Sequence, residues 1–485
     1  MTDSPRARNP VVAAALSFVM PGAGQAYLGR RRLALLLGLP AVLLVIGIAL
    51  LLTVFADDVR NDLFSDRFLT AALIVDVAVM LWRLAAIGEA GFGGWRGWLS
   101  HLPRLRRAGA IGLVVVLLGT TVAMHTWAGV VLVRLNDTLS DVFSGDPRGP
   151  RGDGNSDPGG GPLNEPAYHW DGTERVTFLL LGIDAAPGRE AALTDTILAV
   201  SVDPVAREAV MVSIPRDTGF IPLPDRSVYP DGVYPNKING LASEASARPD
   251  VWCPDLPVTA SEACGLRTLE RAVALYLGLP IQYFAHVDLA GFAALIDAVG
   301  GVTLCLEGTL VDPDYAGPGW EVRGIELPEG CTEYDGARAL AYSRIRHGWI
   351  ELPDGSTQQQ NDFLRADRQQ QVLLELRREF ARMDLIFELP SMLNAVGRTV
   401  STDFPRSMAG DLASLLPLIT GPSIEREVLG LPEYVDPPID AAANYLLVPR
   451  RDAIRAGMQE LLGPGVTLEG WYLGSDDEGP PEGAT

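Results

Sequence analysis

Three long apolar segments constrain the fold of this 485-residue chain more than any other feature. They cover residues 34–56, 69–87 and 111–133. A helix needs about 20 mostly apolar residues to cross a bilayer, and each segment is close to that length. The middle segment carries Asp76 and Arg83, so it is the least apolar of the three. The sequence therefore predicts an all-α membrane region over residues 1–134.

Arginines between the apolar segments predict how this region is oriented. Arg30, Arg31 and Arg32 precede the first segment, and a second group of arginines at 104, 106 and 107 precedes the third. The loop between the first two segments is acidic instead. Because basic loops stay on the cytoplasmic side, we expect a multi-pass protein of the cell membrane with a cytoplasmic N-terminus. Everything after residue 134 would then be extracellular.

Residues 11–28 form a fourth apolar segment of a different kind. Arginines flank it on both sides, and Pro21-Gly22-Ala23-Gly24 interrupts it. This pattern favours a re-entrant hairpin dipping in from the cytoplasmic face, and a full fourth span is the alternative. Asp76, Arg83 and His125 lie in or near the apolar segments. Such residues can mark a proton or ion path, but pairing between helices is the simpler interpretation.

Charge divides the chain in two. Residues 1–134 carry a net charge of +6, so the remainder of this −21 chain carries −27. Residues 135–172 are rich in Gly, Pro and Asp and are predicted to be a disordered stalk. Residues 173–465 are long enough for one large domain, and residues 466–485 are predicted to be a C-terminal end with an acidic disordered tail. The negative charge and the external location argue against a nucleic-acid partner.

Strand-like runs open the outer domain and bring polar residues to their ends. The runs at 176–181, 197–202 and 209–214 are rich in Val, Ile and Leu, as expected of strands buried on both faces. Later runs alternate with helical patterns, which predicts an α/β domain. Chemistry in such folds collects where strands end. Asp184, Asp195, Arg216 and Asp217 occupy those positions. Together they suit a metal ion and a phosphate, and the alternative is a set of solvated turn residues with a salt bridge.

All four cysteines lie in the outer domain, at Cys253, Cys264, Cys305 and Cys331. An even number outside the membrane suits disulfides in an oxidising compartment. A zinc site is the rival interpretation, but the sequence has no Cys-x-x-Cys and no nearby histidine. Proximity predicts the pairs Cys253–Cys264 and Cys305–Cys331, although the sequence leaves the other two connectivities open.

Positive charge in this acidic domain is concentrated at a few positions. Lys237 is the only lysine in the chain. Arg344 and Arg346 lie at the end of one predicted helix, and Arg365 and Arg368 share a face near the start of another. A helix start favours an anion. Surface ion pairs are the alternative explanation for each arginine pair.

Seven sequence elements together resemble the LytR-CpsA-Psr (LCP) family, membrane-anchored enzymes of Gram-positive cell walls. The elements are Gly182-Ile183-Asp184, Thr194-Asp195-Thr196, the segments 213–218 and 237–239, Gly300-Gly301-Val302, and the segments 335–346 and 362–370. The resemblance covers about residues 175–380. It implies a central mixed sheet flanked by helices.

The resemblance also implies an activity, a phosphotransferase that moves a glycopolymer from a polyprenyl-pyrophosphate carrier to peptidoglycan. Asp184 and Asp195 match the ligands of Mg²⁺, for which Mn²⁺ could substitute. The pyrophosphate-binding set would comprise Arg216, Lys237, Arg344, Arg346, Arg365 and Gln370, with Arg368 as a further substrate-binding residue. The catalytic residues would be Arg216, Asp217, Arg344 and Arg346. The polyprenyl tail would need an apolar groove, to which helices at 289–299 and 372–380 could contribute. Mg²⁺ with phosphate oxygens and arginine forks suits phosphoryl transfer.

One position departs from the family pattern. Leu193 occurs where the family usually has an arginine, and Arg189 could reach back to replace it. The general base for the acceptor hydroxyl is open between Asp217 and Asp195. Two other functions are also open, a pyrophosphatase that uses water as acceptor and a non-catalytic receptor for polyprenyl lipids.

Overall fold

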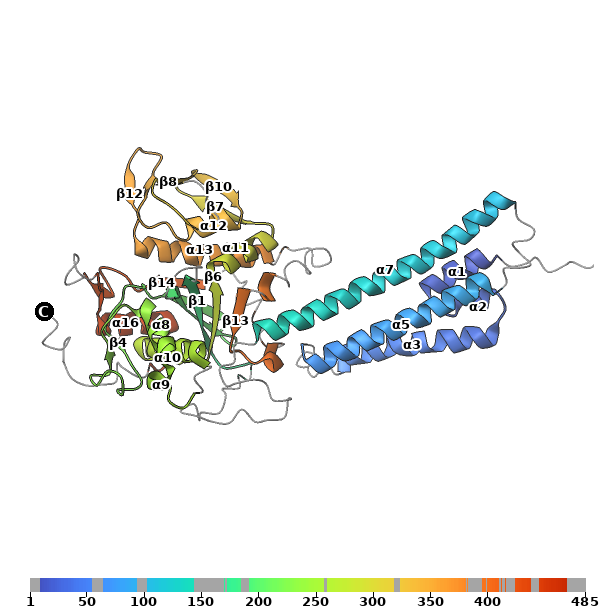
Figure 1. Cartoon of the computed structure of the whole chain (residues 1–485), viewed down its shortest axis with the longest axis horizontal. Coiled ribbons are helices and arrows are strands. Elements are labelled where there is room, and N and C mark those ends of the chain that lie inside the picture. The colour runs from blue at the N-terminus through green and yellow to red at the C-terminus, as the bar shows by residue number, and fades with distance from the viewer. Residues whose placement is uncertain are drawn as a thin grey trace, which may run out of the picture. The chain divides into compact units, whose positions relative to one another are not determined.

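The computed structural model divides the chain into two compact units, residues 1–137 and 138–485 (Figure 1). Each is described by itself. The structure describes residues 9–54, 64–93, 103–143, 170, 172–184, 192–256, 260–317, 323–380, 382, 395–397, 399–409, 411, 415, 424–437 and 445–468. Arg189, most of the predicted stalk and most of the predicted C-terminal tail lie outside these residues.

The first unit is helical. Its helices are α1 (Pro10–Val19), α2 (Ala23–Tyr27), α3 (Arg31–Val54), α5 (Asp66–Phe92) and α7 (Arg104–Val142), and the last residues of α7, from Thr138 on, belong to the second unit. By length and composition, α3, α5 and α7 could each cross a membrane, as the three apolar segments predict. With ten residues, α1 is too short to do so. It forms a helical hairpin with α2, and Gly22 in the turn has φ +91° and no room for a Cβ beside the Ala34 carbonyl.

Polar side chains in this unit pair between helices. His125 Nδ1 on α7 lies 2.7 Å from Asp76 Oδ1 on α5, and Arg83 Nη2 donates to the Phe18 carbonyl at 2.8 Å. Gln25 is fully buried and donates to the Ala86 carbonyl at 2.8 Å. These contacts favour the structural interpretation of the ionisable residues over an ion path.

Helix α7 extends further than the sequence predicts. Residues 135–142, assigned above to the stalk, are its last turns. Leu139, Val142 and Phe143 are buried, and the Phe143 ring centroid lies 6.3 Å from that of Phe404. Burial of these apolar side chains stabilises helix in a segment whose Asn and Asp content suggested a loop.

The second unit is built on a six-stranded mixed sheet. Its order is β13-β6-β1-β2-β3-β14. Pairs β1–β6 and β3–β14 are parallel, and the other three are antiparallel. The strands are β1 (Val176–Asp184), β2 (Leu193–Asp203), β3 (Glu208–Ser213), β6 (Tyr283–Asp288), β13 (Val400–Thr402) and β14 (Ile424–Val428). The predicted central mixed sheet flanked by helices is therefore confirmed.

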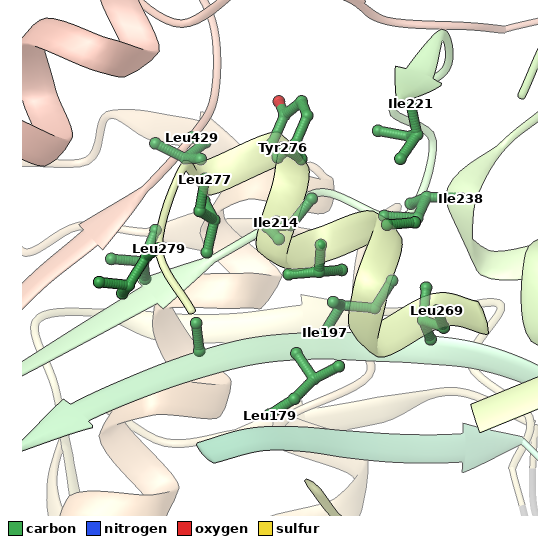
Figure 2. Close-up of a cluster of buried hydrophobic side chains, with 14 of the residues drawn as sticks. Leu179, Ile197, Ile214, Ile221, Ile238, Leu269, Tyr276, Leu277, Leu279 and Leu429 are labelled. Carbon is green, nitrogen blue, oxygen red and sulfur yellow. The ribbon is translucent and has the colours of Figure 1, made fainter. Parts of the chain in front are cut away.

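Helices cover both faces of this sheet (Figure 1). On one face lie α8 (Leu241–Ala247), α10 (Ser261–Leu277) and α16 (Arg451–Leu462); on the other lie α11 (Leu289–Ala298), α12 (Gly336–Tyr342) and α13 (Asp362–Phe380). The main core fills the first interface. Figure 2 shows Leu179 and Ile197 of the sheet directed toward Leu269 and Leu277 of α10.

The segment that follows β3 contains several short elements. These are β4 (Ile221–Pro222), β5 (Val233–Tyr234), η1 (Ile238–Gly240), α8 and α9 (Pro249–Trp252). None of them is long enough to give a clear hydrophobic period in the sequence. The segment still contributes Ile221, Tyr234, Ile238 and Leu241 to the main core.

Small sheets extend the second unit beside α12 and α13. Strand β7 (Val302–Leu306) pairs with β10 (Gly330–Tyr334). A four-stranded sheet comprises β8 (Thr309–Asp312), β9 (Ile325–Leu327), β11 (Trp349–Glu351) and β12 (Thr357–Gln359). The remaining elements are β15 (Val435–Asp436), β16 (Val448–Pro449) and η3 (Arg406–Met408).

The structure joins the cysteines as Cys253–Cys264 and Cys305–Cys331, the pairing that proximity predicts. Replacing both Cys305 and Cys331 with serine should lower the free energy of unfolding by about 3 kcal/mol, because the unfolded chain regains loop entropy. Their sequence separation is 26, against 11 for the other pair. The matching Cys253/Cys264 variant should therefore lose less, by roughly 0.5–1 kcal/mol. Urea unfolding of the full chain in detergent would measure both losses, and a larger loss for the shorter loop would contradict this account.

Candidate active site

The predicted site residues gather at one edge of the central sheet. Asp184 ends β1, and its register partner Leu193 begins the antiparallel strand β2, with Asp195 two residues later. Strand β3 ends at Ser213 beside Leu198, and the chain then delivers Arg216 and Asp217 to the same edge. The ends of adjacent strands therefore bring together carboxylates and a guanidinium that are far apart in sequence.

Arg216 contacts three carboxylates of this cluster. Its Nη1 donates to Asp195 Oδ2 at 2.8 Å, and its Nε lies 3.4 Å from Asp362 Oδ1 and 3.9 Å from Asp217 Oδ2. Burial by itself would lower the pKa of Arg216, but the surrounding carboxylates more than offset this and raise the pKa above its ordinary value. The guanidinium is therefore firmly charged and placed among three carboxylates.

Lys237 reaches the same cluster from the start of η1. Its Nζ lies 2.8 Å from Asp217 Oδ1 and 5.9 Å from the centroid of the Tyr445 ring. Asn239, two residues on, donates through Nδ2 to Asp195 Oδ1 at 3.4 Å. The Thr194 hydroxyl donates to the Asn239 carbonyl at 3.1 Å and so ties η1 to β2. The chain's single lysine therefore adds a point charge to the cluster.

Helix α13 contributes Arg365 and Asp362 from its first turn. Arg365 Nη2 lies 3.1 Å from Asp362 Oδ1 and donates to the Asp195 carbonyl at 3.1 Å. Burial lowers the pKa of Arg365. It raises the pKa of Asp362, an effect that Arg365 and Arg216 oppose. Asp362 and Asn239 were not predicted as site residues, although both lie within the family motifs at 362–370 and 237–239.

Arg344 approaches from the end of α12. Its Nη2 lies 3.5 Å from Asp184 Oδ2, and the Asp184 side chain is only 5% exposed. Arg344 Nη1 is buried and makes no hydrogen bond to any described residue. A buried guanidinium nitrogen without a protein acceptor is suited to an anionic ligand. Arg346, two residues on, is half-buried.

Arg368 and Gln370 are directed to other partners. Arg368 Nε donates to the Tyr342 carbonyl at 2.9 Å, and its other nitrogens contact Gln360 and the Ile345 carbonyl. Gln370 Nε2 donates to Ser213 Oγ at 2.8 Å and to the Glu427 carbonyl at 3.0 Å. The structure therefore places these two side chains where they connect α13 to α12, β3 and β14.

An apolar cavity of about 220 Å³ lies between the sheet and helices α11 and α13. Its apolar walls comprise Leu180, Leu198, Ala285, Leu289, Phe292, Leu295, Leu373 and Leu376. Asp195, Arg344 and Arg365 line the same cavity. Because Asp195 precedes Leu198 along β2, the charged groups lie at the sheet edge and the apolar walls lie deeper. This arrangement suits an amphiphile with an apolar chain and an anionic head.

The described residues contain no group of three or more His, Cys, Asp or Glu side chains that could hold a metal ion. Asp184 and Asp195 are two carboxylates at neighbouring strand ends. Two carboxylates fit Mg²⁺ when phosphate oxygens complete its coordination, and fit poorly an all-protein cage. The residues present therefore match a metal that binds together with a phosphorylated substrate.

A histidine lies in the strand next to β1. His286 on β6 is 18% exposed, and its Nε2 lies 3.8 Å from Glu262 Oε1. Burial lowers its pKa below 6.5, while Glu262 and Asp288 oppose the shift. The folded chain thus favours the neutral imidazole, whereas the unfolded chain takes up a proton near pH 6.5.

This shift predicts a loss of stability on the acid side. As pH falls through 6.5 toward the lowered pKa of the folded state, the contribution of neutral His286 should disappear. Asp141, Glu262 and Asp288 are the acidic residues that line the cavity around it. The melting temperature of the His286→Gln variant should therefore fall less than that of the parent between pH 7.5 and pH 5. Equal decreases in both proteins would contradict the prediction.

Comparison with known proteins decides the family. The model of the LytR_cpsA_psr family matches residues 158–433, which is more than half of the chain. The chain belongs to this family. The matched region contains every site residue predicted from the sequence, from Asp184 to Gln370.

Curated relatives share 26–30% sequence identity with this chain. The teichoic acid transferase TagU of Halalkalibacterium halodurans is 26% identical over 296 residues, which cover 61% of this chain and 79% of TagU. The cell wall biosynthesis protein LcpA of Corynebacterium glutamicum is 30% identical over 213 residues, 43% of this chain and 38% of LcpA. The regulatory protein MsrR of Staphylococcus aureus is 27% identical over 237 residues, 48% of this chain and 58% of MsrR. The chain spans less than two thirds of the length of the last two.

Solved structures give weaker matches. TagV of B. subtilis is 22% identical and has a TM-score of 0.43, with 60% of this chain and 98% of TagV covered. Protein gbs0355 from Streptococcus agalactiae is 17% identical, with a TM-score of 0.45 and coverage of 60% and 88%.

Leu193, where the family pattern has an arginine, starts β2 as the register partner of Asp184. Arg344 is the guanidinium that the structure places against Asp184, at 3.5 Å. Arg189, which could have replaced the family arginine, lies outside the described residues.

Proposed function

We propose that this protein transfers a glycopolymer from a polyprenyl-pyrophosphate carrier to peptidoglycan at the outer face of the cell membrane. The observation that carries the proposal is the apolar cavity whose sheet-edge end is lined by Asp195, Arg344 and Arg365. Three apolar helices long enough to span a membrane would keep the site close to a lipid substrate. Relatives named for teichoic acid transfer and cell wall biosynthesis support the same assignment.

In this scheme the polyprenyl chain occupies the apolar cavity, and burial of its methylene groups supplies most of the affinity. The pyrophosphate lies at the sheet edge, within reach of Arg344, Arg365 and Arg216. The Arg344 nitrogen that has no hydrogen bond to a described residue provides one donor for a phosphate oxygen. Lys237 adds a point charge. Arg368 and Gln370 act indirectly, by fixing α13 against its neighbours.

Asp184 and Asp195 would hold Mg²⁺, or Mn²⁺ in its place, together with phosphate oxygens of the substrate. The ion would neutralise charge on the pyrophosphate. Arg216 and Arg344 contact these carboxylates now. Binding of substrate and metal would redirect both guanidinium groups from the carboxylates to the phosphates.

The acceptor hydroxyl needs a group to receive its proton. Asp195 is assigned to the metal, so Asp217 is the better candidate of the two carboxylates named from the sequence. It is 8% exposed and lies beside Arg216 and Lys237. A weak base is sufficient because phosphoryl transfer depends more on charge neutralisation and in-line positioning than on proton removal.

The test uses the full chain in lipid nanodiscs with a synthetic polyprenyl-pyrophosphoryl oligosaccharide and peptidoglycan glycan fragments. We expect Mg²⁺-dependent formation of an oligosaccharide–glycan phosphodiester together with polyprenyl phosphate. If the lipid is cleaved at the same rate and to the same products without glycan fragments, the protein is a pyrophosphatase. Tight lipid binding without any cleavage would identify a receptor. Either outcome would refute the proposed transfer.

A further inference from the structure

A second and larger cavity, of about 740 Å³, lies on the opposite face of the same sheet edge. Helices α8 and α10 contribute Ser243, Ser246, Ser261 and Glu262 to its lining, and β6 contributes His286. Thr399, just before β13, and Ser401, within it, add further hydroxyl groups. Neither the sequence motifs nor the transfer scheme above uses this cavity.

The two cavities share a wall. Ile183 and Thr194 are register partners in the β1–β2 ladder and line the larger cavity, whereas Gly182 and Asp195, the residues beside them, line the apolar one. Successive residues of a strand point to opposite faces, so this ladder separates the two spaces. His286, Asp288 and Val400 line both cavities. The carboxylates Asp184 and Asp195 therefore lie at the sheet edge from which both cavities extend.

The chemistry of the larger cavity differs from that of the apolar one. Asp141, Glu262 and Asp288 line it, and none of its described lining residues is a lysine or arginine. These three carboxylates disfavour an anionic ligand such as a lipid phosphate. His286 is neutral near pH 7 because burial lowers its pKa. Numerous hydroxyls, carboxylate acceptors and a neutral imidazole suit an uncharged ligand with many hydroxyl groups, which describes a carbohydrate.

We propose that this cavity is the acceptor subsite and binds the uncharged, hydroxyl-rich backbone of a peptidoglycan glycan strand. The assignment rests on the proposed transferase function and adds to it the place from which the acceptor arrives. An acceptor hydroxyl oxygen reaches over the sheet edge and forms a bond to the phosphorus that carries the glycopolymer. The bond from that phosphorus to the bridging oxygen breaks, polyprenyl phosphate leaves with the electron pair, and the hydroxyl proton passes to a carboxylate.

The first sugars of the donor glycopolymer have the same chemistry and are the other source of a carbohydrate here. Ala247, an exposed residue of α8 that lines the cavity, allows the two sources to be distinguished. Phenylalanine at this position would project into the cavity from the helix surface and leave the core unchanged. Ala206 is exposed in the turn between β2 and β3, at the other edge of the sheet, so Ala206→Phe is the matched control.

Two measurements on the full chain in nanodiscs test the proposal. The first is calorimetric binding of the β-1,4-linked tetrasaccharide of N-acetylglucosamine, a neutral mimic of the glycan backbone. The second is the steady-state KM of transfer for the glycan acceptor and for the lipid donor. We expect the tetrasaccharide to bind the parent protein and Ala206→Phe alike, and to bind Ala247→Phe at least tenfold more weakly. The acceptor KM of Ala247→Phe should rise by a similar factor, with its donor KM within twofold of the parent value.

The alternative results are distinct. Absence of tetrasaccharide binding to the parent, or equal binding to Ala247→Phe, would overturn the proposal even if transfer proceeds. A rise in the donor KM alone would assign the cavity to the donor glycopolymer and also overturn it. Tetrasaccharide binding that Ala247→Phe weakens, in a protein that performs no transfer, would refute the proposed function while supporting a carbohydrate site.

Discussion

Replacing Arg216 with alanine is expected to lower the rate of glycopolymer transfer by about 10²–10³-fold, the usual effect of removing one preorganised charge from a transition state. Arg216 contacts Asp195 at 2.8 Å and lies within 4 Å of Asp217 and Asp362. Its loss would leave three mostly buried carboxylates without their shared cation. These carboxylates lie where the pyrophosphate would add further negative charge during transfer. The rate of polyprenyl phosphate release at saturating donor concentration measures the effect.

The control for this variant is Arg323→Ala. Arg323 also pairs with an aspartate, Asp314 at 2.7 Å, but its side chain is 75% exposed. An exposed pair of this kind contributes little to stability, so the control should retain the parent rate. Arg216→Lys separates charge from geometry, because lysine restores the charge without the planar fork. We expect it to recover only a small part of the lost rate. Full activity in Arg216→Ala would remove the cluster from the mechanism.

The sequence showed which site residues follow the ends of strands, but it did not show which side chains they contact. Buried runs ending in Asp184 and in Pro215-Arg216-Asp217 were recognisable because strands buried on both faces are continuously apolar. These apolar runs show where a strand ends, but they do not show which strands pair with each other. That Arg344 meets Asp184 while Arg216 meets Asp195 depends on the pairing order β6-β1-β2-β3, which is set by contacts distant in sequence.

Residue type alone also does not show which groups Arg368 and Gln370 contact. Arg368 and Gln370 carry groups suited to phosphate, and they follow Arg365 closely on α13. A helix advances about 100° per residue, so Arg368 lies within about 60° of Arg365 around α13, whereas Gln370 lies about 140° away. Arg365 reaches the Asp195 carbonyl, whereas Arg368 reaches Tyr342 and Gln370 reaches Ser213. Conversely, Asp362 was missed because a helix-start carboxylate usually serves only the helix dipole.

The larger cavity was invisible in the sequence for a related reason. Its lining combines α8, a seven-residue helix, with one end of β6 and the short strand β13. Serine and threonine at these positions resemble ordinary surface residues. Only the folded chain shows that they surround a space adjoining the charged sheet edge.

Filling the apolar cavity should strongly reduce transfer from long-chain donors. Ala285 on β6 lines this cavity of about 220 Å³, and a tryptophan at this position would occupy much of it. Excluding even four methylene groups of a polyprenyl chain would remove about 3 kcal/mol of apolar burial. We therefore expect kcat/KM for a polyprenyl-pyrophosphoryl donor to fall by at least about 100-fold, because 1.4 kcal/mol corresponds to a factor of ten. Ala290→Trp, at an exposed position of α11, is the matched control and should leave kcat/KM unchanged.

Donor chain length distinguishes exclusion of the lipid from general misfolding of Ala285→Trp. A donor with a single short isoprenoid unit does not need the deep end of the cavity, where Leu180 and Leu198 lie. It should react with Ala285→Trp and with the parent at rates within a few-fold of each other, whereas the advantage of the long donor should disappear in the variant. Misfolding would lower both rates equally. A variant that keeps the parent's preference for the long donor would show that the polyprenyl chain binds elsewhere, and the assignment of the adjoining charged edge to pyrophosphate would then lose its main support.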